Sequence, residues 1–431
     1  MLQTHHKKLK KMTLALCGAF LFSSYVFAEE GYRHEAGEKE GYGLKQGEKA
    51  PLFGHETHQT EQPLDTGLIE SLTGFKYNET SFMQSLGVKF GGFTEIGFAG
   101  NPKDPNDNRN GPVTFAEKPN NFRLHQVYGF IEREADRSTD TISFGFRADV
   151  MYGTDARFSS ARNFDTNVLN TSNDKNLIFP QVYGEIFLPA GNGVTAKVGH
   201  FYTLIGYEVV PSTGNFFFTH AYTMQYGEPF THTGALLSYP INDNIEVTGG
   251  VVTGWDSNFK QPANFLGSVA YSTDDEGTSL TTSVITGDVR TRGLGVNDDH
   301  NRTMGSVVLE HDFTDRLHYV IQSDFGYEES TAFAGSSKWY GVNQYAFYDV
   351  LHNLTAGIRG EWFRDEDGVR VLGNGVGQNF WAVTGGVNYT PIAGFTIRPE
   401  VRYDRNSSGN AFNDGKKDDQ ILLSVSGIFR F

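Results

Sequence analysis

The sequence predicts an all-β protein, a transmembrane antiparallel up-and-down β-barrel of about 16 strands. From Leu86 onward, apolar and polar residues alternate in segments of roughly ten residues, the length and period of strands that cross a bilayer at a tilt. The connections between these segments alternate strictly between short and long. The chain also ends in the aromatic run "SVSGIFRF", whereas a soluble domain usually ends in a frayed, polar tail.

Residues 1–28 have the composition of an export signal. A basic opening with four lysines precedes the mostly apolar stretch 12–27, and Val26-Phe27-Ala28 puts small residues where a signal peptidase could cut. The stretch is short for a membrane span, and the polar run "EEGYRHEAGEKEG" follows directly. We expect this segment to be removed. The single cysteine, Cys17, is removed with it, so disulfide chemistry is excluded.

Residues 29–85 form an acidic tail that we expect to be mostly flexible and periplasmic. They contain an imperfect tandem decapeptide, "EGYRHEAGEK" then "EGYGLKQGEK", and few large apolar residues before "LIESLTGF". Without residues 1–28, the chain has 32 basic and 51 acidic residues, a formal charge of −19. Such a charge disfavours nucleic acid as a partner.

Residues 86–431 are predicted to form the barrel. The strands are expected at 86–98, 122–133, 141–152, 179–188, 193–204, 231–239, 244–255, 264–271, 279–288, 303–311, 316–327, 338–348, 353–363, 378–389, 394–404 and 419–431. In "ISFGFRADVMYG" and "FTIRPEVRYDR" the apolar residues occupy one face and the polar residues the other. A soluble sandwich could show the same alternation, so the connections must decide.

The connections favour a membrane barrel. Every second connection has four to seven residues, and the others have eight to 26. Outer-membrane barrels combine short periplasmic turns with long external loops in this way, and an even strand number leaves both termini on the periplasmic side. The alternative is 18 strands, if 216–226 supplies two further strand segments.

The last strand explains the aromatic ending. Its residues Ile421, Leu423, Val425, Phe429 and Phe431 share one face, which we expect to contact outer-membrane lipid. Pairing of this strand with the first would close the sheet and leave no open edge in hydrocarbon. An ending on Phe429 and Phe431 also resembles the signal that the outer-membrane assembly machinery recognises in bacterial porins.

Several motifs resemble one family. "FRADVMYGTDARF", "VGHFYTLIGYEVV", "YGEPFTHTGALLSY" and "VTGGVVTGWD" are similar to motifs of the β-barrel porin-2 (OmpL-like) family of bacterial outer-membrane proteins. The likeness covers about residues 80–431 and leaves the tail outside. It implies a barrel with a channel, and it implies no particular substrate.

Charged residues lie opposite the lipid face of several strands. An arginine at the bilayer mid-plane costs about 2 to 4 kcal/mol, so these side chains must face a polar interior. They are predicted to line a wet pore, a plugged barrel filled with ion pairs being the alternative. Barrels of about sixteen strands usually leave an aqueous channel. The predicted pore-lining residues are Arg147, Asp149, Arg359, Glu361, Arg398, Glu400, Arg402 and Asp404.

The third long connection, residues 205–230, is dense in aromatic side chains that a solvated loop would not favour. In sixteen-stranded porins the equivalent loop folds into the lumen. We therefore predict that this third loop forms a constriction, with Glu208 and Glu228 near it.

These features predict a porin of the Gram-negative outer membrane, passing small hydrophilic solutes and ions by passive diffusion with a weak preference for cations. The alternative is a structural or adhesive barrel with a closed lumen. His200, His220 and His232 lie near serines and threonines, but no nucleophile elbow is present, so we expect no enzyme, cofactor or metal site. The sequence leaves open the solute, its size limit and whether barrels associate as homotrimers.

Overall fold

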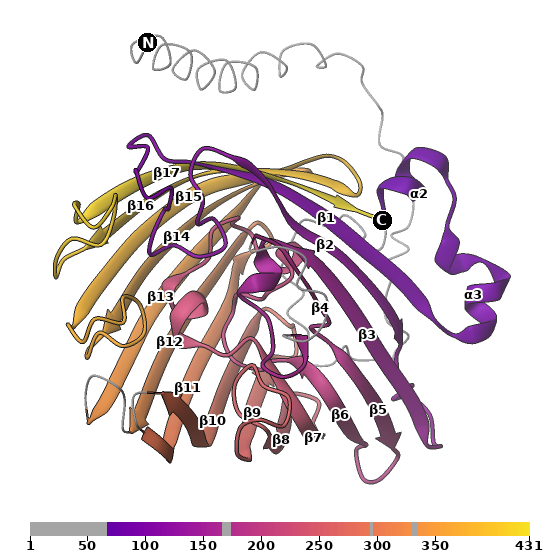
Figure 1. The fold of residues 1–431 in the computed structure, drawn as a ribbon. Coiled ribbons are helices and arrows are strands. Elements are labelled where there is room, and N and C mark those ends of the chain that lie inside the picture. Colours follow the sequence, from indigo (N-terminus) through magenta and orange to yellow (C-terminus); the bar gives the residue numbers. More distant parts are fainter. Residues whose placement is uncertain (1–66, 166–173, 294–295, 330–334) are drawn as a thin grey trace, which may run out of the picture. The chain divides into compact units, whose positions relative to one another are not determined.

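The computed structural model describes residues 67–165, 174–293, 296–329 and 335–431, and Figure 1 shows them as a closed ring of strands. The strands are β1 Lys89–Gly100, β2 Phe122–Arg133, β3 Ser143–Gly153, β4 Asn176–Ile178, β5 Val182–Leu188, β6 Val194–Tyr202, β7 Thr231–Asn242, β8 Ile245–Val252, β9 Asn264–Ser272, β10 Thr278–Gly293, β11 Val296–Thr314, β12 Leu317–Glu329, β13 Ser336–Leu351, β14 Leu354–Asp365, β15 Gln378–Ile392, β16 Phe395–Asn406 and β17 Asp419–Arg430.

Neighbouring strands pair in antiparallel order around the ring, and β17 pairs with β1. The short strands β4 and β5 both pair with β3, β4 at its end and β5 along its first half. They therefore form one interrupted wall strand, so the 17 strands of the described sheet make a 16-strand barrel, the number that the sequence predicted, and the division of this strand into two was not predicted. The prediction of one continuous strand at 179–188 is therefore wrong, because the structure has β4 and β5 with a gap between them. Pro180 lies between β4 and β5. Proline has no N–H to donate to the neighbouring strand, so it interrupts the ladder there.

The C-terminal strand closes the barrel. The backbone nitrogen of Phe431 donates to the Gly92 carbonyl at 2.9 Å, and the Gly92 nitrogen donates to the Phe431 carbonyl at 3.1 Å. A side chain at Gly92 would collide with the Phe431 ring and the Tyr128 carbonyl, so glycine is required there. The ring of Phe429 stacks on that of Phe395 with centroids 4.5 Å apart. The terminal residues are thus held by pairing, as expected.

The two faces of the wall differ as the period-two pattern predicts. On β3, Phe144, Phe146 and Val150 are exposed on the outer surface, while Asp149 and Met151 are buried inside. The same holds around the ring, where exposed residues such as Leu237, Val251 and Trp381 point outward. The outer surface therefore presents the apolar side chains that hydrocarbon requires.

The connections follow the predicted alternation except at two places on the long-loop side, where two residues join β10 to β11 and six join β12 to β13. The loop predicted at 289–302 is wrong, because β10 and β11 continue pairing to Gly293↔Val296. The described residues of this ribbon include Arg290 and Asp299 on one face and His300 on the other, so both of its faces carry polar side chains. A ribbon without an apolar face lacks the period-two signal, which is why the pattern suggested a loop.

Short helices precede the barrel. They are α2 Leu68–Thr73, the 3₁₀ turn η2 Tyr77–Glu79 and α3 Ser81–Leu86. The first strand accordingly begins at Lys89 and not at residue 86. Residues 1–66, which include the predicted signal and most of the tail, lie outside the described residues. No helix in the described ranges is long and apolar enough to cross a membrane.

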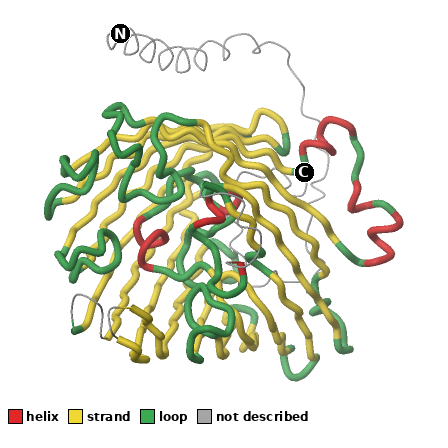
Figure 2. Tube along the Cα trace, in the orientation of Figure 1, coloured by secondary structure: helices red, strands yellow, loops and turns green. Residues whose placement is uncertain are grey.

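The third loop, residues 205–230 between β6 and β7, lies inside the ring of strands (Figure 2). It contains the 3₁₀ turn η5 Ser212–Gly214 and the π-helical turn η6 Thr223–Gly227. The alternative of 18 strands is therefore wrong, since helical turns and irregular backbone occupy 216–226. Tyr222 packs with Trp339, Phe363 and Phe380 of the wall, so the loop's aromatic residues are buried.

Candidate functional site

The site is built where the third loop meets the inner face of β12 to β17 and β1. Arg359 of β14 is at its centre and is fully buried. Its Nη1 donates to Glu208 Oε1 at 2.7 Å and to the Thr219 carbonyl at 2.6 Å, and its Nε donates to Glu361 Oε1 at 3.2 Å. One guanidinium therefore binds two separate parts of the loop to the wall.

Glu208 receives further donors. The Ala221 nitrogen donates to its Oε2 at 2.9 Å, and the same oxygen lies 3.0 Å from Nδ1 of His220. Tyr345 of β13 donates from its hydroxyl to Oε1 at 3.0 Å. Burial alone would raise the pKa of this carboxyl, but Arg359 and His220 lower the pKa to about 2. Glu208 is therefore an ionised anchor at any ordinary pH.

Strand β16 binds the loop backbone with alternating charges. Arg398 Nη1 donates to the carbonyls of Ser212 at 3.0 Å and Asn215 at 2.6 Å. Glu400 accepts from the backbone nitrogens of Phe218 at 2.8 Å and Thr219 at 3.1 Å. The order of charge along the strand thus matches the order of carbonyls and amides along the loop.

The same strand continues this pattern toward the long-loop end of the barrel. Arg402 Nη1 donates to the His220 carbonyl at 2.8 Å, and its Nε donates to Asp404 Oδ1 at 2.8 Å. Asp404 also accepts from the Tyr222 hydroxyl at 2.9 Å, and Glu361 accepts from the Tyr222 nitrogen at 2.7 Å. We call Arg359, Glu361, Arg398, Glu400, Arg402 and Asp404 the charge ladder.

The structure places all eight predicted pore-lining residues on the inner face, in two groups. The six residues of the charge ladder are 0–5% exposed and contact the third loop. Arg147 and Asp149 of β3 form a separate ion pair, with Arg147 Nε 2.9 Å from Asp149 Oδ1 and Nη1 3.2 Å from Glu132. The ladder therefore contacts protein more than open water, and lining of a pore by these residues stays a prediction.

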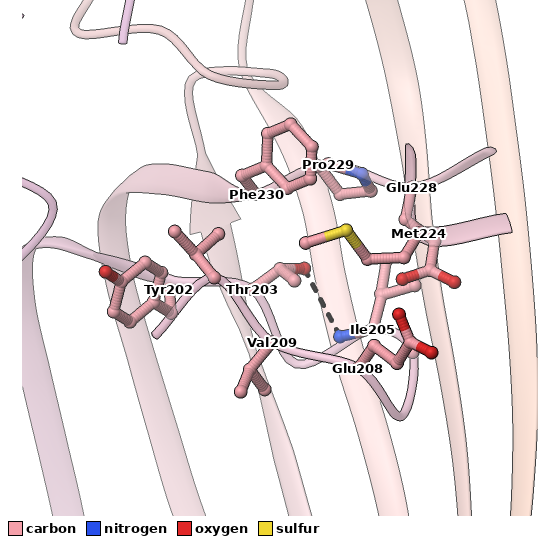
Figure 3. A pocket seen from close by; sticks show the side chains of 11 residues that line it. Tyr202, Thr203, Ile205, Glu208, Val209, Met224, Glu228, Pro229 and Phe230 are labelled. Atoms are coloured by element: carbon pink, nitrogen blue, oxygen red, sulfur yellow. Dashed lines mark hydrogen bonds between the residues drawn. The ribbon is translucent and has the colours of Figure 1, made fainter. Parts of the chain in front are cut away.

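Glu228, the other predicted constriction residue, has a different environment. Its Oε1 accepts from Gln322 Nε2 at 2.6 Å, and the same nitrogen donates to Asp324 Oδ2 at 2.8 Å. A cavity of about 30 Å³, enough for one or two water molecules, lies beside Glu228 and Glu208 (Figure 3). Burial and the neighbouring Asp324 raise the pKa of Glu228 well above its ordinary value.

Sequence reasoning missed several residues of the site. Glu95 of β1 pairs with Arg398 and accepts from Ser212, and Gln322 of β12 donates to both Glu228 and Asp324. Glu95 and Asp324 are acids at inward positions of strands in which apolar and polar residues alternate. The period-two pattern that identified the charge ladder could therefore have identified them. The backbone groups of the loop carry no comparable signal.

Comparisons with known proteins agree with this architecture. The family model described as putative beta-barrel porin-2, OmpL-like, matches residues 87–431. No curated protein matches the sequence.

Solved structures of outer-membrane proteins share the fold. The outer membrane channel DcaP of Acinetobacter baumannii has 13% identity and a TM-score of 0.54, with 80% of this chain and 97% of that chain covered. OmpT of Vibrio cholerae in its trimer form has 8% identity and a TM-score of 0.54, covering 80% and 99%. An anion-selective porin from Comamonas acidovorans has 11% identity and a TM-score of 0.55, also covering 80% and 99%.

At these sequence identities the solved structures show the fold alone. The family model matches most of the chain and therefore shows the family. The protein is therefore an outer-membrane barrel, and it belongs to the putative beta-barrel porin-2, OmpL-like family.

Proposed function

We propose that the protein is a porin that forms an aqueous channel for passive diffusion of small hydrophilic solutes and ions. The observation that carries this proposal is the third loop, which folds inside a sixteen-strand barrel and is bound there by the charge ladder. A loop held inside the barrel would narrow a channel without replacing it, and barrels of this size usually have room for water beside such a loop.

Planar-bilayer recording of the purified, folded protein tests the proposal. Stable steps of ionic conductance support it, and conductance with a size series of neutral sugars would then give the exclusion limit. Silence from protein whose folding is verified by heat-modifiable migration in electrophoresis contradicts it.

The second candidate is a structural or adhesive barrel with a closed lumen. The complete burial of Arg359, Arg402 and Asp404 favours this candidate, because these side chains are satisfied by the loop and by one another. The same recordings separate the two functions, since a closed barrel would give no steps.

A weak preference for cations belongs to the porin proposal. Residues 86–431 carry a formal charge of −13, much of it in exposed loops such as "RDEDG" and "NDGKKDD". Glu208 adds little, because Arg359 neutralises it, and the ladder itself balances three arginines with three acids. The acidic loops at the mouth would thus supply any preference.

The proposal includes a Gram-negative host, removal of residues 1–28 on export, and a periplasmic tail over 29–85. It also includes recognition of Phe429 and Phe431 by the outer-membrane assembly machinery, lipid around the outer surface, and no enzymatic activity. A homotrimer is supported by the fold shared with OmpT, whose structure is described as a trimer form.

A further inference from the structure

Two carboxyl groups meet beside the third loop with one amide between them. Glu228 of the loop and Asp324 of β12 both accept from Nε2 of Gln322, at 2.6 and 2.8 Å. The amide cannot turn away, because its Oε1 accepts from the backbone nitrogen of Tyr207 at 3.1 Å. Glu228 is 5% exposed and Asp324 is 2% exposed, so little water screens their charges.

Neither carboxyl has a cationic partner among the described residues. Gln322 donates to both carboxyls, Glu208 lines the same cavity as Glu228, and Ser306 of β11 lies opposite Asp324 in the sheet. Glu208 cannot help, because Arg359 and His220 already bind it. The phenol of Tyr207 is neutral at ordinary pH. The surroundings of the pair are therefore uncharged or negative.

Two ionised carboxylates cannot remain this close in a buried site without a cation. One proton must stay with the pair, and its titration belongs to both groups together. A shared proton also supplies a donor where each carboxylate would otherwise only accept. The pair thus holds the loop to β12 while the proton is present.

The Glu228–Asp324 pair lies where separation of Glu228 from β12 would move the third loop. Oε2 of Glu228 is 2.0 Å from the position that a Cβ at Gly206 would take, so this carboxyl packs directly against the start of the loop. The next anchor is Trp339 Nε1, which donates to the Gly227 carbonyl at 3.0 Å. The cavity in Figure 3 borders Glu228, Met224 and Pro229, giving water a place beside the pair.

We propose that Glu228, Asp324 and Gln322 form a proton-dependent latch, which holds residues 224–230 of the third loop against β12 and releases them when the shared proton is lost. The latch deepens the porin proposal and rests on it, because release of this segment widens the route beside the loop. Arg359 and Arg398 continue to hold the rest of the loop, so the latch adjusts the channel and does not empty the barrel.

The direction of the pH effect follows from the raised affinity for the proton. Below about pH 4.3, the ordinary pKa of a glutamate, the latched form has its full stability. Above that pH the ratio of released to latched protein rises by up to about tenfold per pH unit, until the pair itself ionises. The Glu208 anchor does not change in this range, because its low pKa keeps it ionised. Current should therefore rise from acidic to alkaline pH.

The experiment is planar-bilayer recording from pH 4 to pH 9 with wild type, Glu228→Gln and Glu228→Ala. We expect wild-type current to increase with pH. Glu228→Gln mimics the protonated acid and should keep the low, acidic-pH current throughout, while Glu228→Ala should show the high current throughout. Glu276→Gln, in the exposed turn between β9 and β10, should behave as wild type. Wild-type pH dependence that survives in Glu228→Gln overturns the latch.

A second measurement tests the proton directly. Infrared spectroscopy of the folded protein at pH 7 should show a protonated carboxyl band that is absent from the Glu228→Gln/Asp324→Asn double variant. Identical spectra would overturn the latch whatever the currents show. Silence at every pH contradicts the porin function, whereas a steady current at every pH contradicts only the latch.

Discussion

Arg359 joins both halves of the third loop to the barrel wall, through Glu208 and the Thr219 carbonyl. A buried guanidinium is costly to desolvate, so its net contribution is modest while every partner is present. Removal of one partner is different, because the remaining charge stays buried without compensation. The ladder therefore specifies where the loop sits more than it adds to the stability of the barrel.

Arg359→Met tests this view. We expect the free energy of unfolding in detergent to fall by about 3 to 5 kcal/mol, because Glu208 and Glu361 lose a buried cation. Glu361 keeps Arg402, whose Nη1 lies 3.1 Å from Glu361 Oε1. Among the described residues, Glu208 then keeps His220 as its one basic ion-pair partner. The double variant Arg359→Met/Glu208→Gln should accordingly recover part of the loss.

Arg290→Met is the matched control for the Arg359 experiment. Arg290 pairs with Asp299, but the two side chains are 44% and 40% exposed, so water can replace the lost partner. Denaturant midpoints of the variants give the comparison. Equal losses at positions 359 and 290 would show that the loop is not held by buried charge.

At the scale of elements, the last residue extends the ladder between β1 and β17 that closes the barrel, which runs from Gly100↔Leu423 to Phe93↔Arg430. The backbone of Phe431 forms two hydrogen bonds with Gly92, and its ring packs against the same residue. Phe431→Ala keeps the backbone pairing and removes the ring, whereas deletion of residue 431 removes both.

If the ring is the assembly signal, Phe431→Ala should reduce the amount of folded protein in outer membranes severalfold, yet the purified chain should still fold in detergent. Deletion of residue 431 should reduce both assembly in cells and folding in detergent, because Gly92 at the start of β1 loses its backbone hydrogen-bond partner. Heat-modifiable migration measures the folded fraction in each case. Normal assembly of Phe431→Ala in cells would exclude the ring as a signal.

The alternation of short and long connections predicts their sides. An epitope or protease site inserted among the exposed residues 106–109 or 407–410 should be reachable on intact cells. One inserted in the β7–β8 turn at 243–244 should become reachable only after the outer membrane is permeabilised. Access to the turn on intact cells would invert the orientation, and access to all three sites would contradict the strand assignment.

At the scale of the whole molecule, charge at the mouth and charge at the third loop can be distinguished by salt. The field of exposed loops is screened within about 30 Å at 0.01 M salt but within about 3 Å at 1 M. We therefore expect the reversal potential across a salt gradient to favour cations weakly at low salt and to approach no preference at high salt.

A preference that persists at 1 M would instead place the selecting charge inside the barrel, where screening is weak. Preference for chloride would show that the arginines of the charge ladder, and not the acidic loops, control passage. The measurement uses wild-type protein, with the acidic loop variant Asp418→Asn/Asp414→Asn as the comparison.

The sequence by itself determined the barrel. Period-two alternation, strand length and the spacing of connections are local patterns, and hydrocarbon admits few ways to satisfy the backbone of such strands. Strand number, closure through the last strand and the inward set of charges could all be predicted for this reason. The misplaced details were also local: Pro180 divides one strand, and the ribbon of β10 and β11 continues where no apolar face marks it.

Only the tertiary structure decided what the inward charges do. Arg398 and Glu400 bind backbone groups of the third loop, and backbone carbonyls and amides have no signature in sequence. Glu208 and Glu228 are the same residue type in the same loop, yet one meets Arg359 and the other meets Asp324. The ionisation of a buried acid depends on which charge lies within a few ångströms, and that distance exists only after the chain has closed.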